Sequence, residues 1–187
     1  MVTRRTPAVL VLAALAALAS SPAHAVLSGG SKSSTPAAPA QAQTPRQQAE
    51  RLYAEGYDEV EKGKQELASG KTKNAEKRFR KALEKGETAV ALDSTYAEAL
   101  NLVGYSARKL GDYDKALAAY DRALRIKPDY AAAREYLGEA YVELGRIEQA
   151  REQLAQLEKL GATEEARTLK GAIDAYEQAK AGGPPAH

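Results

Sequence analysis

The chain has 187 residues, of which 44% are apolar and 28% are charged, and this is enough for one modest domain with short flanking segments. It contains no cysteine, and its two histidines are His24 near the start and His187 at the end. Disulfides, thiolate nucleophiles, zinc–thiolate sites and iron–sulfur clusters are therefore excluded, and no histidine in the body of the chain can transfer protons or bind a metal.

The first 25 residues have the pattern of a secretory signal peptide. Arg4 and Arg5 give a positive start, residues 7–19 form an uncharged apolar run, and Ala23-His24-Ala25 is a small-residue cleavage site. The apolar run is shorter than the roughly 20 residues that span a membrane, so an uncleaved anchor is the weaker alternative. We expect a secreted protein of the periplasm, cleaved after Ala25 and not stably inserted in the membrane.

Cleavage changes the net charge. The whole chain carries 27 basic and 25 acidic residues, and residues 1–25 hold two of the basic ones and no acids, so the mature chain is formally neutral. The basic isoelectric point of the precursor therefore gives no argument for a nucleic-acid partner, and we expect none.

Residues 26–45 are rich in Ser, Gly, Pro, Ala and Gln, which predicts a disordered linker, and residues 181–187 predict a disordered tail. Between these segments every clear periodicity is helical. Helices are predicted at about 47–69 and 74–92, within a degenerate hairpin that spans residues 46–96. A break at Gly86 is the alternative for the second helix, because an interior glycine costs about 1 kcal/mol relative to alanine.

From residue 97 the sequence repeats itself with a period of 34 residues. Gly104 aligns with Gly138, and Gly111 aligns with Gly145. The apolar residues around them form one stripe on each of two helices per repeat, with Gly104 and Gly138 where a neighbouring helix must come close. Gly111 and Gly145 suit the turns, and Asp112 is placed to cap the helix that follows.

This pattern resembles the tetratricopeptide repeat. The unit at 97–130 matches the family at these positions: Leu100, Val103, Gly104, Ala107, Ala116, Tyr120, Ala123 and Pro128. The unit at 131–162 matches through Leu137, Gly138, Tyr141, Ala150 and Leu154, and departs at Arg134 and Leu157. The resemblance implies an all-α fold, a right-handed α–α superhelix of helical hairpins. Because each hairpin has apolar faces that it cannot bury alone, the hairpins must stack, and a C-terminal helix at 163–180 is expected to cap the stack.

The resemblance also implies a concave groove lined by the first helix of each hairpin. The groove residues that it implies are Glu98, Asn101, Tyr105, Arg108 and Lys109 in one unit, and Ala132, Glu135, Glu139, Val142 and Glu143 in the next. Glu135, Glu139 and Glu143 lie four residues apart and form an acidic ladder that would attract a basic partner segment; the alternative is an ordinary solvated helix face. Among the tyrosines, Tyr105 is expected to be exposed for binding, Tyr57 is second, and Tyr136 is left unassigned.

Two other functions remain as alternatives. The basic run at 71–85 suits an anionic envelope polymer, although these positions also fit the solvated face of a helix. A glycosidase needs two carboxyl groups roughly 5–10 Å apart, one with a raised pKa. Glu135 and Glu139 satisfy the spacing, but nothing in the sequence indicates the apolar burial that would raise the pKa of either.

We therefore expect a non-enzymatic adaptor that holds a peptide segment of another envelope protein in the groove. No catalytic residue, cofactor or metal site is expected, and self-association through the uncapped N-terminal end is left open. The alternative is glycan or cell-wall binding, or a carboxylate-dependent hydrolase.

Overall fold

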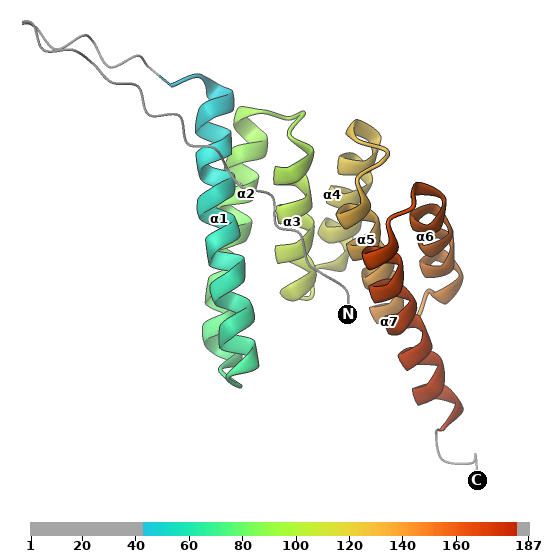
Figure 1. Cartoon of the computed structure of the whole chain (residues 1–187). Helices are drawn as coiled ribbons and strands as arrows, with labels where there is room; N and C mark the ends of the chain where they lie inside the picture. The colour runs from blue at the N-terminus through green and yellow to red at the C-terminus, as the bar shows by residue number, and fades with distance from the viewer. Residues whose placement is uncertain (1–42, 183–187) are drawn as a thin grey trace, which may run out of the picture. The chain divides into compact units, whose positions relative to one another are not determined.

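The computed structural model describes residues 43–182. The predicted signal peptide, residues 26–42 of the predicted linker and residues 183–187 of the predicted tail lie outside the described residues. The described part of the chain contains seven helices and no strand (Figure 1). These are α1 (Pro45–Ala68), α2 (Thr72–Leu92), α3 (Ala97–Lys109), α4 (Tyr113–Ile126), α5 (Ala131–Glu143), α6 (Ile147–Leu160) and α7 (Thr163–Ala181). The predicted all-α fold of helical hairpins is confirmed.

Helix α1 begins at Pro45, inside the segment that was predicted to be linker. Thr44 and Gln47 form a capping box there: the Thr44 hydroxyl accepts from the Gln47 backbone N–H at 3.2 Å, and the Gln47 side chain accepts from the Thr44 N–H at 2.9 Å. Pro45 occupies the first helical position, where its fixed φ suits the helix and its missing N–H leaves no bond unmade. The helix therefore begins within the segment of linker composition, two residues before the predicted start near residue 47.

Helix α2 runs through Gly86 without a break. A Cβ atom at Gly86 would lie 3.0 Å from Val103 Cγ2 and 3.4 Å from the Val103 backbone nitrogen, so the glycine is present because α3 comes close. The alternative of a break at this residue is wrong. The first hairpin therefore has helices of 24 and 21 residues, whereas the helices of the next two hairpins have 13 or 14.

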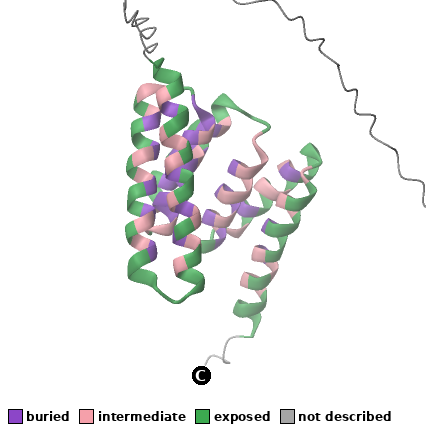
Figure 2. Ribbon diagram, turned by 60° about the vertical axis from the view of Figure 1, so that its left-hand side comes forward, coloured by how far each residue is buried: buried purple, intermediate pink, exposed green. Residues whose placement is uncertain are grey.

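The hairpins stack in chain order. Helix α1 packs on α2, α3 on α4 and α5 on α6, while α2 contacts α3 and α4 contacts α5. The first helices of the hairpins also contact one another, α1 with α3 and α3 with α5. Helix α7 packs on both α5 and α6, where Leu169 and Ile173 are buried. Buried residues lie along the sides on which neighbouring helices meet (Figure 2).

At Gly104 and Gly138, a side chain from a neighbouring helix lies directly against the backbone of the glycine. A Cβ atom at Gly104 would lie 2.5 Å from Cε1 of Tyr120, whose side chain is fully buried. Gly138 lies against Leu169 of α7 in the same way. The prediction that these two glycines admit a neighbouring helix is confirmed, and the structure adds which side chain fills each space.

We expect Gly104→Ala to lower the free energy of unfolding by about 1–3 kcal/mol, because the rigid Tyr120 ring must move in a packed core. Gly171→Ala is the matched control, since a Cβ there meets nothing within 4 Å and alanine favours a helix interior by up to about 1 kcal/mol. Urea unfolding of both variants measures the difference. Equal effects at the two positions would show that Gly104 does not serve close packing.

Candidate functional site

Arg108 of α3 lies in the interior, between two hairpins. It is only 4% exposed, and its guanidinium pairs with the Glu139 carboxylate at 2.6 Å and with the Glu143 carboxylate at 2.8 Å. A buried cation needs such partners, because removing an unpaired charge from water is very unfavourable. Burial lowers the pKa of Arg108, but Tyr120 and the two carboxylates more than offset this, so that its pKa is raised.

The prediction that the acidic ladder forms an open acidic surface is therefore wrong. Glu139 and Glu143 are both occupied by Arg108, so they are not available to attract a basic partner segment. Residue spacing places the three glutamates correctly on one face of α5, but the sequence pattern does not show that α3 supplies a cation to that face. Val142, another implied groove residue, is 9% exposed and packs in the core shared with α7.

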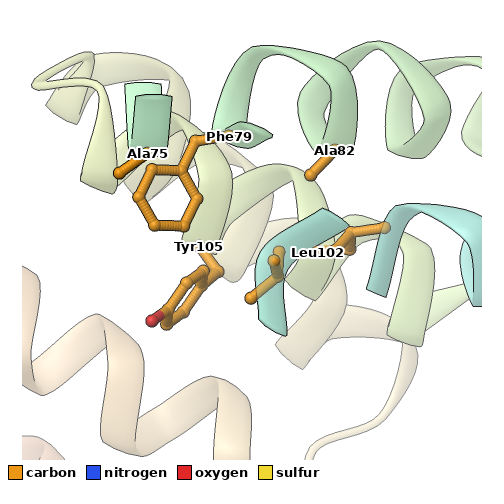
Figure 3. Close-up of a cluster of buried hydrophobic side chains, with 6 residues drawn as sticks. Ala75, Phe79, Ala82, Leu102 and Tyr105 are labelled. Atoms are coloured by element: carbon orange, nitrogen blue, oxygen red, sulfur yellow. The ribbon is translucent and has the colours of Figure 1, made fainter. Parts of the chain in front are cut away.

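The prediction that Tyr105 is exposed is also wrong, since the residue is 9% exposed. Its ring meets Phe79 and Tyr136 edge-on, with ring centroids 6.3 and 5.1 Å apart. Figure 3 shows Tyr105 beside Phe79 and Leu102, in the cluster that also contains Val60. Val60 of α1 and Phe79 of α2 therefore cover Tyr105 from the side of the first hairpin. Burial raises the pKa of Tyr105, which keeps its hydroxyl protonated.

The remaining implied residues of α3 have local partners. Glu98 pairs with Lys127 at 3.2 Å, and the Asn101 side-chain amide donates to the Tyr130 hydroxyl at 3.3 Å. Lys109 is half-buried, and its ammonium lies 5.5 Å from the centre of the Tyr105 ring. Burial, followed by the nearby Arg108 charge, lowers the pKa of Lys109.

The structure brings some of these residues together in a cavity of about 210 Å³ between the first helices of the hairpins. We call it the tyrosine cavity. Its lining residues are Tyr53, Tyr57, Val60 and Lys64 of α1, Asn101, Leu102 and Tyr105 of α3, and Tyr130, Ala132 and Tyr136 at the start of α5 and within it. Of the implied groove residues, Asn101, Tyr105 and Ala132 line this cavity, whereas the charged residues implied by the resemblance do not.

The cavity combines aromatic faces with polar groups. Burial raises the pKa of Tyr136 to about 12 and also raises the pKa of Tyr53 and Tyr130, so these hydroxyls are protonated at neutral pH. The Lys64 ammonium lies 5.3 Å from the centre of the Tyr105 ring. Asn101 contributes a buried side-chain oxygen that has no hydrogen-bond partner within the described part of the chain. Such a mixture of apolar surface and a few convergent polar groups is typical of a binding pocket.

Comparison with known families supports the repeat pattern. Two family models, each described as tetratricopeptide repeat, match residues 60–131 and 107–180, and together they span more than half of the chain. The chain belongs to the tetratricopeptide repeat family. Among curated proteins, none matches this chain.

Several solved structures share the fold of this chain. The Sgt2 TPR domain from Aspergillus fumigatus is 20% identical, with a TM-score of 0.57 over 77% of this chain and 89% of that one. The type III secretion translocator chaperone SycD from Yersinia enterocolitica is 19% identical, with a TM-score of 0.50 over 71% and 93%. A type III secretion complex from Aeromonas hydrophila gives 19% identity and a TM-score of 0.50 over 72% and 84%. At these identities the likeness establishes the fold alone.

Of the two tyrosines that α1 adds to the cavity of this tetratricopeptide repeat protein, the sequence indicates only Tyr57, which is 49% exposed as expected. Tyr53 and Lys64 are not among the implied groove residues, because the family match is weak in the first hairpin. A signal was nevertheless present, since Tyr53, Tyr57, Val60 and Lys64 follow one another at intervals of four, three and four residues, which is one face of a helix. Tyr130, the N-cap residue of α5, is likewise not among the implied groove residues.

Glu135 of α5 has an unusual environment for a carboxyl group. Burial, followed by the charges of Glu139 and Glu165, raises its pKa to about 7, against an opposing influence of Arg108 and Lys64. Nothing in the sequence indicates this environment, because it depends on the packing of α7, which carries Glu165, against α5. Glu135 does not line the tyrosine cavity, but Tyr136, the next residue, does.

This pKa predicts a pH-dependent stability. The folded chain holds the Glu135 proton more tightly than the unfolded chain, so the contribution to stability is full below pH 4.5 and is lost as the pH rises to about 7. Because the side chain is only half-buried, solvent screening limits the loss to about 1–2 kcal/mol. Relative to the wild type, Glu135→Gln should therefore gain this amount in free energy of unfolding between pH 5 and pH 8.

Urea unfolding across that pH range measures the effect. The control is Glu148→Gln, at a glutamate whose side chain is 83% exposed. A pH-independent difference between Glu135→Gln and the wild type would contradict the raised pKa.

The basic run lies on α2, and part of it is paired within the first hairpin. Arg78 pairs with Glu59 at 3.0 Å, and Lys85 pairs with Glu55 at 2.5 Å. Lys73, Lys77 and Lys81 are exposed. This arrangement is that of a solvated helix face, with two of its cations joining α2 to α1.

Proposed function

We propose that this protein is a non-enzymatic adaptor of the cell envelope, which holds a segment of a partner protein at the tyrosine cavity. The observation that carries the proposal is the convergence of five tyrosines on one cavity between successive hairpins. Tyrosine supplies a large apolar surface together with a hydroxyl, and it is enriched among the residues that contribute most to protein binding. Stacked helical repeats characteristically bind partners on such concave surfaces.

The envelope location rests on the N-terminal sequence. Residues 1–25 have the charge, apolar run and cleavage site of a signal peptide, which supports export to the periplasm. Within residues 43–182, no helix is long and apolar enough to cross a membrane. We expect the mature chain to begin at Val26, and N-terminal sequencing of protein from the periplasmic fraction tests this. Full-length protein retained in the cytoplasm would contradict export.

Crosslinking in living cells tests the adaptor function directly. A photoreactive amino acid in place of Tyr57, which lines the cavity and is 49% exposed, should capture a partner protein. The same amino acid at Arg125, an exposed position on α4, is the control and should not capture that partner.

A second substitution connects capture to the cavity. Ala132→Trp should fill the cavity and abolish crosslinking from position 57, while Ala155→Trp, on an exposed part of α6, should leave it unchanged. Capture that is equal from positions 57 and 125, or insensitive to Ala132→Trp, would contradict binding at the cavity.

A carboxylate-dependent hydrolase or glycan-binding protein is the second candidate, and one observation favours it. Glu135, with a pKa of about 7, is a proton donor at neutral pH, and Glu139 lies one helical turn away. A hydrolase would release soluble fragments from purified cell-wall glycan and would lose this activity in Glu135→Gln. Absence of release by the wild-type protein would reject it.

A further inference from the structure

We infer that the far end of the first hairpin docks on a membrane surface that carries anionic lipid headgroups. This end comprises the last turn of α1, the turn at Gly70 and the first half of α2, residues 66–81, and we call it the basic end. It is separate from the tyrosine cavity, because Tyr57 precedes Leu67 by ten residues, about 15 Å along the helix. A chain held at the basic end can therefore still bind a partner at the cavity.

The charge of the basic end is local and is not a property of the whole chain. From residue 26 onward the chain is formally neutral, yet residues 71–81 contain six basic residues and one acidic residue. Two acids of α1 offset part of this charge, because Glu59 pairs with Arg78 at 3.0 Å and Glu66 lies 3.7 Å from Lys71. A positive excess therefore remains at one end of a chain with no net charge.

Three lysines carry this excess. Lys73, Lys77 and Lys81 are exposed and have no ion-pair partner within residues 43–182. They follow one another at intervals of four residues, so they form one stripe along α2, which we call the lysine stripe. Like charges at this spacing repel one another and disfavour the helix. Solvation explains why these lysines are exposed, but only an anionic partner converts their repulsion into a gain.

The shape of the first hairpin places the basic end where it can meet a flat surface. Helices α1 and α2 have 24 and 21 residues whereas α3 has 13, and the turn between α1 and α2 extends beyond the end of α3 (Figure 1). Residues 67–74 are all exposed (Figure 2). This turn therefore reaches a surface ahead of the neighbouring hairpin.

An exposed leucine favours a membrane over a soluble polyanion. Leu67, in the last turn of α1, is 41% exposed and lies four residues before Lys71. A leucine beside several cations is typical of segments that bind the interface of an anionic membrane, where the apolar side chain enters the acyl boundary and the cations meet the headgroups. A hydrated polyanion offers charge but no apolar region, so it gives the leucine no gain.

A hollow at the basic end provides donors for a headgroup phosphate. Its volume is about 270 Å³, and its lining residues are Glu66, Asn74, Lys77, Arg78 and Lys81. The side-chain amide of Asn74 and the two ammonium groups donate hydrogen bonds, and lysine binds phosphate as a point charge. The Glu66 carboxylate opposes an anion there, but Lys71 lies 3.7 Å from it and offsets part of that repulsion.

Cosedimentation of the processed protein with lipid vesicles tests the inference. Vesicles of phosphatidylcholine with about 30% phosphatidylglycerol should bind the protein, and vesicles of phosphatidylcholine alone should bind it at least 10-fold more weakly. Raising the salt concentration from about 0.05 M to about 0.5 M should release most of the bound protein, because salt shortens the range of these attractions.

Charge substitutions locate the contact. Lys73→Gln, Lys77→Gln and Lys81→Gln together should weaken binding to the anionic vesicles about 100-fold, since each lysine near such a surface contributes about 5-fold. They should not lower the melting temperature, because they remove repulsion within α2. The control makes the same change in net charge at exposed residues of α4 and α6 and should weaken binding less than about 3-fold; it combines Arg122→Gln, Arg125→Gln and Lys159→Gln.

A substitution at Leu67 distinguishes a membrane from a soluble polyanion. Leu67→Gln should weaken binding to the anionic vesicles about 5-fold, because the apolar side chain no longer enters the interface. It should leave binding to heparin, a soluble polyanion, unchanged. Leu160→Gln, at a leucine of α6 that is 44% exposed, is the control and should change neither.

Equal binding to the two kinds of vesicle, or equal losses from the two triple substitutions, would overturn the inference. Wild-type binding of Leu67→Gln to the anionic vesicles would also overturn it, because the basic end would then attract polyanions in general. The adaptor function would survive each of these results, since crosslinking from position 57 tests it separately.

Discussion

Arg108→Ala is expected to lower the free energy of unfolding by about 3 kcal/mol. The substitution leaves Glu139 and Glu143 without their shared cation, and it opens a space beside the rings of Tyr105 and Tyr136. Removing one partner of a buried ion pair typically costs about 3–5 kcal/mol, and the partial exposure of the two carboxylates places this case near the lower end.

Arg108→Lys should recover little of this loss, because a single ammonium cannot bond to both carboxylates in the way that the planar guanidinium does. The control is Lys115→Ala, which removes an ion pair with Glu87 at 2.7 Å whose side chains are 41% and 47% exposed. That pair also joins two hairpins, but it lies in solvent and should contribute less than about 1 kcal/mol.

Urea unfolding of Arg108→Ala, Glu139→Gln and the double variant gives the coupling energy between these two residues. We expect a coupling of at least about 1 kcal/mol, as for residues in one buried network. A coupling near zero, or equal losses for Arg108→Ala and Lys115→Ala, would contradict the role of Arg108 in joining the second and third hairpins.

Leu169→Ala is the second substitution with a large expected effect, about 3 kcal/mol. Leu169 is fully buried and packs against Val142, Leu157 and the face of α5 at Gly138. The loss combines the apolar surface of the side chain with the cavity left behind, which together cost about 2–5 kcal/mol for a buried leucine.

The double variant Gly138→Ala/Leu169→Ala makes this test specific to the contact between α5 and α7. Each single substitution should destabilise, but the double variant should lose less than the two combined, because the new methyl group occupies part of the space that Leu169 vacates. Leu160→Ala, at a leucine that is 44% exposed, is the control. Additive losses would mean that Leu169 does not fill the space beside Gly138.

The sequence predicted the stacked hairpins well because their signals are local. Gly104 and Gly138 recur with the 34-residue period, Gly111 and Gly145 form the turns, and Asp112 caps α4 by accepting from the Lys115 backbone N–H at 3.2 Å. The turns and the cap depend on residues within one hairpin, and the two glycines recur at a fixed period, so the spacing alone carries the information.

The functional surface was harder to predict because it depends on contacts between hairpins. Whether Tyr105 is exposed depends on Phe79 of α2 and Tyr136 of α5, and whether Glu139 is available depends on Arg108 of α3. Family positions place these residues on the correct helices but do not show which side chains will meet. Tyr53 of α1 was missed for the same reason, since the first hairpin departs most from the family pattern.

The central claim is that the partner segment binds at the tyrosine cavity. The most direct test is to measure how the backbone amide chemical shifts of the processed protein change when a peptide from the captured partner is added. The account predicts that the largest changes fall on the first helices of the hairpins, at Tyr57, Asn101 and Tyr136, with little change at Arg125 on α4. Changes confined to the outer faces of α2, α4 and α6 would show that the partner binds elsewhere and would contradict the tyrosine cavity as the binding site.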